Sequence, residues 1–87
     1  MRLDPTDLGP VTNRLKRAQG QLNGVIRMLE EGNDCEDVVT QLAAVSKALD
    51  RAGFAIIATG LKQCLAEEGG VESLDTKKME KLFLSLA

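Results

Sequence analysis

The chain has 87 residues, a formal net charge of −2, and no histidine, tryptophan or tyrosine. A chain of this length forms one domain, residues 1–87. It buries only about 60% of the surface that it exposes when unfolded, so we expect assembly into oligomers to add stability. Without histidine, a phosphate-binding loop or a nucleophile paired with a base, the sequence argues against an enzyme.

Composition and hydropathy predict the fold class and the compartment. Leu, Val, Ile and Ala are plentiful and the aromatic residues are two phenylalanines, which favours an all-α protein. The N-terminus has no apolar leader, and the longest uncharged run, roughly residues 52–61, falls well short of the ~18 residues that cross a bilayer. We therefore expect a cytoplasmic protein that does not contact a membrane and keeps its two cysteines reduced.

The first predicted helix begins at Asp4 before Pro5, or at Gly9 before Pro10, because proline is tolerated in a first turn. It ends at Gly32. Its apolar residues alternate in steps of four and three, which predicts a continuous face that packs along the whole helix. These residues are Val11, Leu15, Ala18, Leu22, Val25 and Leu29.

The opposite face of this helix is basic. Residues 8–29 contain no acidic residue, and the positive charges among them are Arg14, Lys16, Arg17 and Arg27. A face without carboxylates that also carries Gly20 and Gly24 lets a phosphate backbone approach closely and release its counterions. A solvated face whose glycines serve subunit packing explains the pattern equally well, so this feature alone does not establish DNA binding.

Two more helices follow. The second starts after Asp34, a typical N-cap residue, continues to about Ala66 and is stopped by the glycine pair at 69–70. The third is short and is capped by Ser73 or Asp75. Its apolar residues are Met79, Leu82, Phe83 and Leu86. The sequence thus predicts a three-helix protomer.

The two thiols, Cys35 and Cys64, would lie near opposite ends of the second helix. At about 1.5 Å per residue they are on the order of 40 Å apart, far beyond the roughly 4.4–6.8 Å between the Cα atoms of a disulfide. They can meet only between chains, in an antiparallel dimer whose two-fold axis passes near Leu49 and Asp50. This dimer would place one cysteine pair at each end.

The antiparallel dimer also brings apolar residues of the two long helices together. The predicted pairs are Val38 with Leu61, Leu42 with Ile57 and Val45 with Phe54, beside an ion pair of Lys62 with Asp37. Any long amphipathic helix gives some apolar matches, so a chance alignment is the alternative explanation.

Four segments carry a resemblance to a known family: RLKRAQGQ at residues 14–21, MLEEGNDC at 28–35, LAAV at 42–45 and ALDR at 48–51. In this order and spacing they resemble the copper-sensing operon repressor family (CsoR/RcnR-like), from about Val11 to Leu86. The resemblance implies an antiparallel dimer paired into a tetramer, and a repressor that releases double-stranded operator DNA. It implies Arg14 and Arg51 as DNA-binding residues, supported by Lys16, Arg17 and Lys47.

The chain departs from this family at one position. Copper-sensing members place Cys, His and Cys at the positions of Cys35, Gly60 and Cys64, so the imidazole ligand is missing here. Nickel or cobalt sensors and formaldehyde sensors also need histidine. The chain is therefore most similar to the persulfide-sensing branch, the CsoR-like sulfurtransferase repressors, with Cys35 and Cys64 as redox-sensing residues and no resident cofactor.

In this interpretation Cys35 attacks a persulfide or polysulfide, and Cys64 of the partner subunit resolves the product into a crosslink that ends repression. One alternative is a repressor that binds Cu(I) through the two thiolates, with an external third ligand. The other is a helical assembly module whose cysteines are inert.

Overall fold

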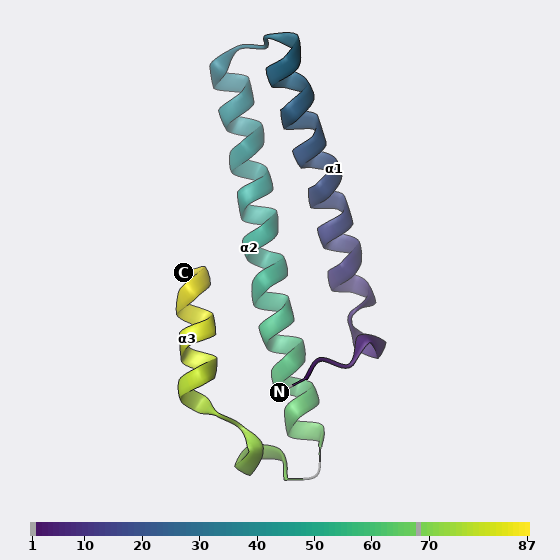
Figure 1. Cartoon of the computed structure of the whole chain (residues 1–87), viewed down its shortest axis with the longest axis vertical. Coiled ribbons are helices and arrows are strands. Elements are labelled where there is room, and N and C mark those ends of the chain that lie inside the picture. The colour runs from purple at the N-terminus through teal and green to yellow at the C-terminus, as the bar shows by residue number, and fades with distance from the viewer. Residues whose placement is uncertain (1, 68) are drawn as a thin grey trace.

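The computed structural model describes residues 2–67 and 69–87, without the side chains of residues 71 and 73. The helices are α1 (Gly9–Glu31), α2 (Cys35–Ala66) and α3 (Thr76–Leu86), with short 3₁₀ turns η1 (Pro5–Asp7) and η2 (Gly70–Ser73). Figure 1 shows α1 and α2 antiparallel and side by side, with α3 folded back along the C-terminal half of α2. The described residues include no strand, so the predicted all-α, three-helix protomer is confirmed. No helix in these ranges is both long enough and apolar enough to cross a membrane.

Both predicted starts of the first helix correspond to real turns. The Asp4 carboxylate accepts hydrogen bonds from the Thr6 hydroxyl (2.6 Å) and amide (2.9 Å), which lower the pKa of Asp4. The bond from the amide also caps η1. The α-helix itself begins at Gly9 and has Pro10 in its first turn. It ends as predicted at Gly32, whose φ of 75° suits a residue without a side chain.

The bounds of α2 and its N-cap residue are as predicted. Asp34 occupies the N-cap position, yet its side chain makes no cap hydrogen bond. Helix α3 is capped by Asp75, whose carboxylate accepts a hydrogen bond from the Lys78 amide at 3.1 Å. Ser73, the other predicted cap, lies in η2, and its side chain is outside the described part.

The core is a seam of small residues between α1 and α2. Its members recur every seven residues on each helix, which is the spacing of two helices that pack at a shallow angle. They are Val11, Ala18 and Val25 on α1, and Val38, Val45 and Ala52 on α2. Small side chains allow the two helices to approach closely, and Met28 packs against one end of the seam.

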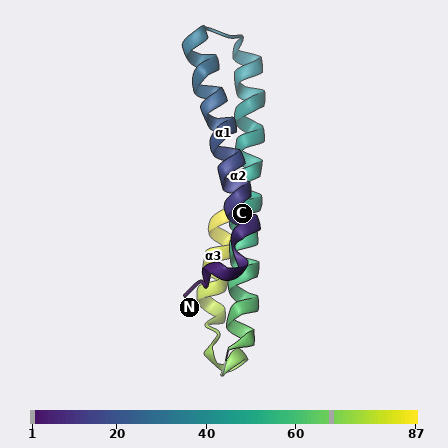
Figure 2. The same ribbon diagram turned by 90° about the vertical axis from the view of Figure 1, so that its right-hand side faces the viewer.

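Within the protomer the predicted packed face of α1 is confirmed for Val11, Ala18 and Val25. Leu15, Leu22 and Leu29 alternate with the buried residues but stay exposed, Leu29 at 64%. The molecule measures 55 × 25 × 12 Å, so it is a thin plate, as the side view in Figure 2 shows. A plate only about two helices wide leaves large apolar side chains on its surface, which is the surface that assembly with another chain would bury.

Two of the predicted contacts between chains are wrong. Val38 and Val45 are 7% and 2% exposed, because α1 covers the face of α2 that was assigned to the partner. Phe54, the predicted partner of Val45, contacts Phe83 of α3 with ring centroids 5.1 Å apart. Leu42 is still 47% exposed, so its pairing with Ile57 stays a prediction.

Candidate nucleic-acid interface and thiol positions

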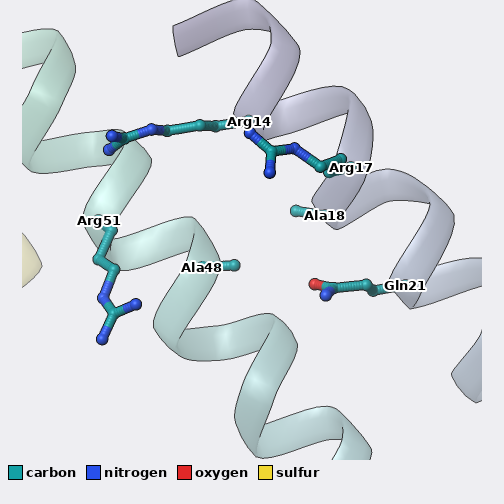
Figure 3. A pocket seen from close by; sticks show the side chains of 6 residues that line it. All are labelled: Arg14, Arg17, Ala18, Gln21, Ala48 and Arg51. Atoms are coloured by element: carbon teal, nitrogen blue, oxygen red, sulfur yellow. The ribbon is translucent and has the colours of Figure 1, made fainter. Parts of the chain in front are cut away.

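Three arginines from two helices line a shallow groove between α1 and α2. Arg14 and Arg17 come from α1 and Arg51 comes from α2. In Figure 3 the side chain of Arg14 reaches across the gap toward α2, and Arg17 leans into the same gap. The groove has a volume of about 340 Å³, and Ala18, Gln21 and Ala48 complete its lining.

Helical spacing explains this arrangement. Residues 14, 17, 18 and 21 share one face of α1, and residues 48 and 51 share one face of α2, because residues three or four apart lie above one another. Ala18 and Ala48 are short, so the space between the long arginine side chains stays open. The groove thus exists because two of its lining residues are alanines, and it is basic because three others are arginines.

The chemistry of the groove favours a multiply charged anion. Among the described residues no carboxylate lines it, so the three guanidinium groups are not neutralised there. A guanidinium offers a planar fork of N–H donors that matches two phosphate oxygens at once. Three such guanidinium groups from two helices suit the phosphates of a nucleic-acid backbone. Contacts to phosphates position a protein on DNA but do not read the base sequence.

The predicted DNA-binding residues divide into two groups. Arg14, Arg17 and Arg51 line the groove, whereas Lys16 and Lys47 are exposed and do not line it. Gln21 was not assigned a role from the sequence, although its position seven residues after Arg14 places both on one helix face. Its side-chain amide adds a neutral hydrogen-bonding group to the groove.

The two interior glycines of α1, Gly20 and Gly24, are not needed for packing within the protomer. A Cβ added at Gly20 or Gly24 would meet no other atom within 4 Å. Glycine inside a helix costs roughly 0.5–1 kcal/mol relative to alanine, and no close contact at these positions within the described protomer requires it. The open surface at both positions is consistent with close approach by another molecule.

The two thiols occupy opposite ends of one continuous helix, as the sequence predicts. Cys35 is the first residue of α2 and is exposed, whereas Cys64 lies in its last turn and is 4% exposed. The Cys64 thiol lies 3.9 Å from the backbone oxygen of Gly70, which belongs to η2. Since α2 is unbroken between them, the two sulfurs of one chain cannot form a disulfide.

The two thiols of one chain lie at opposite ends of α2 and therefore cannot share a metal ion. No group of three or more His, Cys, Asp or Glu side chains suited to a metal occurs in the part of the chain that the structure describes. Gly60, which is buried one turn before Cys64, supplies no ligand. Thiolates suit Cu(I), but Cys35 and Cys64 from two subunits would provide two ligands and leave any third position to an external group.

Similar proteins identify the family. The sequence model of the family described as metal-sensitive transcriptional repressor matches residues 9–85. The copper-sensing transcriptional repressor CsoR of Mycobacterium ulcerans is 46% identical over 54 residues, which cover 62% of this chain and 46% of that protein. The copper-sensing transcriptional repressor RicR of Mycobacterium tuberculosis is 40% identical over 60 residues, covering 66% of this chain and 62% of that protein.

A further relative, the uncharacterized protein YrkD of Bacillus subtilis, is 52% identical over 40 residues, which cover 46% of this chain and 64% of YrkD. No solved structure gives a significant match. The chain spans about half the length of the CsoR relatives that it matches. The family match nevertheless covers nearly all of α1, α2 and α3, and it confirms the resemblance to the copper-sensing repressor family but not its persulfide-sensing branch. The chain belongs to the metal-sensitive transcriptional repressors, a family of regulators rather than enzymes.

Proposed function

We propose that this protein is a cytoplasmic transcriptional repressor that binds double-stranded operator DNA through the arginine groove. A chemical change at Cys35 and Cys64 then releases the DNA. The observation that carries the proposal is that Arg14, Arg17 and Arg51 line one groove that no carboxylate lines among the described residues. Relatives named as transcriptional repressors support it.

The active form in this proposal is a dimer of antiparallel dimers. The exposed apolar residues on both long helices support assembly, since a thin plate cannot cover them by itself. They include Leu15, Leu22, Ile26 and Leu29 on α1, and Val39, Leu42 and Leu49 on α2. An antiparallel pair of α2 helices would bring Cys35 of one subunit to Cys64 of the partner subunit.

The sensing reaction that we favour transfers sulfur. The Cys35 thiolate attacks the outer sulfur of a persulfide R–S–SH, which forms Cys35–S–SH and releases R–S⁻. The Cys64 thiolate of the partner subunit then attacks the inner sulfur of this persulfide, the Cys35 Sγ, which forms the Cys35–Cys64 disulfide and releases the outer sulfur as HS⁻. Two thiols are oxidised and one sulfane sulfur is reduced to sulfide. The exposure of Cys35 supports its role as the first nucleophile.

Copper is the second candidate inducer. Relatives whose names describe copper-sensing repressors favour it over sulfur chemistry. In that case Cys35 and Cys64 of the partner subunit would hold Cu(I) as thiolates, and an external ligand would complete the site. The absence of an imidazole at Gly60 is the observation that favours the persulfide reaction instead.

DNA binding is tested by fluorescence anisotropy with a labelled promoter fragment, over a series of salt concentrations. We expect Arg14→Ala and Arg51→Ala each to weaken binding on the order of tenfold. Each should also reduce the slope of log K against log salt concentration by about one, because one fewer phosphate is neutralised. Circular dichroism should show unchanged helix content. Arg27→Ala, on the same helix but outside the groove, is the matched control. Undiminished binding in both groove variants contradicts the proposal.

The inducer is tested on the DNA complex with sodium tetrasulfide and with Cu(I) in separate samples. Dissociation by tetrasulfide, together with a crosslinked dimer on a non-reducing gel, supports persulfide sensing. Dissociation by stoichiometric Cu(I) without a crosslink supports copper sensing. If neither reagent changes DNA affinity while mass spectrometry shows that both have reached the thiols, the cysteines are inert and the sensing proposal fails.

A further inference from the structure

The segment before α1 is tied to the far end of α2. We call residues 3–8 the N-terminal strap; Figure 1 shows the chain crossing there from the start of α1 to the C-terminal part of α2. The Asp4 amide donates to Oε1 of Gln63 at 2.8 Å, and Nε2 of Gln63 donates to the Asp4 carbonyl at 2.8 Å. One side chain thus satisfies both backbone polar groups of one residue, in a clamp between positions 59 residues apart.

The clamp is the main tie between the strap and α2. The strap residues are mostly exposed, including Leu3 at 42%, so apolar packing holds the strap only weakly. Beside the clamp is an open hollow of about 430 Å³, lined by Asp4, Asp7, Lys62, Gln63, Ala66 and Glu67. Both hydrogen bonds of the clamp are exposed, so water can replace each of them when the clamp opens.

Short-range hydrogen bonds order the segment from Asp4 into α1. The Asp4 carboxylate holds Thr6, the Leu8 amide donates to the Pro5 carbonyl at 3.2 Å, and the Thr12 amide donates to the Leu8 carbonyl at 2.9 Å. The next turn of α1 carries Arg14 of the groove. The strap therefore connects the end of α2 to the turn that precedes a DNA-binding residue.

The other end of this connection is the buried thiol. Gln63 and Cys64 are neighbours in the last turns of α2, and the Cys64 thiol lies beneath η2 with 4% of its residue surface exposed. An added sulfur atom or a bond to another chain does not fit such a site unless η2 or the end of α2 shifts. A shift of the end of α2 moves the Gln63 amide relative to Asp4.

We propose that the Gln63–Asp4 clamp couples the Cys64 thiol to the arginine groove. The clamp is closed while Cys64 is reduced, and it holds the first turn of α1 in place. A chemical change at Cys64 opens the clamp, frees the strap and loosens the turn before Arg14, so that affinity for DNA falls. This coupling rests on the proposed DNA-binding function. Gln63 acts as a positioning residue and does not contact the DNA.

The first test measures hydrogen exchange of residues 2–12 by mass spectrometry in the reduced, full-length protein without DNA. Gln63→Ala removes the donor and the acceptor of the clamp, and Gln63→Glu keeps an acceptor alone. We expect exchange in residues 4–12 to rise several-fold in Gln63→Ala and less in Gln63→Glu. Gln41→Ala, a half-buried glutamine on the same helix, is the matched control and should leave exchange unchanged.

The second test modifies Cys64 alone. In the Cys35→Ala protein, methyl methanethiosulfonate converts the Cys64 thiolate into a methyl disulfide and releases methanesulfinate, so the test does not depend on the physiological inducer. We expect the labelled protein to show the exchange pattern of Gln63→Ala. Unchanged exchange at full labelling overturns the proposal. A Cys64 that stays unlabelled in excess reagent also overturns it, because a thiol that cannot react cannot move the strap.

The last measurement links the clamp to DNA. We expect Gln63→Ala to bind the promoter fragment several-fold more weakly than the wild type, with Gln63→Glu intermediate and Gln41→Ala unchanged. If exchange rises in Gln63→Ala while DNA affinity stays at the wild-type value, the coupling is wrong although the protein is a DNA-binding repressor. If the wild type does not bind DNA, the proposed function fails and the coupling with it, whereas the exchange data still report whether the clamp exists.

Discussion

Cys35 and Cys64 stand at opposite ends of one unbroken helix, the first exposed and the second buried beneath η2. This relationship separates the two thiols in reactivity as well as in space. An exposed thiol at the start of a helix meets reagents directly, while the buried one reacts only after the structure around it opens. The order of events at the two sulfurs is thus determined by the fold of the protomer.

Alkylation of the reduced protein should follow this order. With N-ethylmaleimide we expect Cys35 to react at least on the order of tenfold faster than Cys64, because its sulfur is open to solvent. A time course of intact mass, with peptide mapping of the singly labelled form, measures both rates. Unfolding in urea should bring the two rates together. A singly labelled form that carries the reagent on Cys64 would contradict the order.

The core seam makes a prediction about stability. Val45 is the largest fully buried side chain among the described residues, so Val45→Ala should lower the free energy of unfolding by about 2 kcal/mol. Leu84→Ala, at a position that is 61% exposed, is the control and should change it by less than about 0.5 kcal/mol. Urea denaturation followed by circular dichroism gives both values. Equal effects of the two substitutions would be evidence against this seam.

The exposed face of α2 makes a separate prediction about assembly. Leu42 is 47% exposed in the protomer, so Leu42→Glu should leave the three helices folded and shift the protein toward smaller species. A carboxylate buried in an apolar contact between subunits loses its hydration, which weakens assembly. On a surface that stays exposed, the same carboxylate keeps its hydration and has little effect. Sedimentation velocity over a range of concentrations measures the shift. If the substitution leaves the oligomeric state unchanged, the predicted contact of Leu42 with Ile57 is wrong.

The helix glycines allow stability and function to be separated. Gly20→Ala should raise the free energy of unfolding by roughly 0.5–1 kcal/mol, since the new methyl group meets nothing in the protomer and alanine favours the helix. If another molecule approaches closely at this point, the same variant binds DNA or its partner subunits less well. Thermal unfolding and anisotropy are measured on one preparation. A variant that is less stable than the wild type would show that the glycine has a role inside the protomer.

Local signals made the helix bounds predictable, whereas the neighbours of each face were not. Gly32 and Asp75 act on the backbone within a few residues of their own position, so sequence patterns locate the ends of the helices. Hydrophobic periodicity shows which face of a helix is buried, but not whether α1 or a second chain covers it. For that reason Val38 and Val45 were assigned to the wrong contact.

The candidate site was predictable to a similar extent. The spacing of Arg14 and Arg17 indicated a basic face on α1, while Arg51 came from the family resemblance and not from any local pattern. The Gln63–Asp4 clamp was not foreseen, because a glutamine near a helix end carries no signal for a partner 59 residues away. Only the folded chain brings the two together.

The central claim is that Cys35 and Cys64 of different subunits meet while those of one chain do not. It is tested most directly by mixing Cys35→Ala and Cys64→Ala subunits, letting them exchange, and treating the mixture with sodium tetrasulfide. Each variant alone lacks one of the two thiols, so neither can form the mixed linkage. The account predicts a Cys35–Cys64 linked peptide and a crosslinked dimer in the mixture alone. A mixture that gives no such peptide after proven subunit exchange would contradict it.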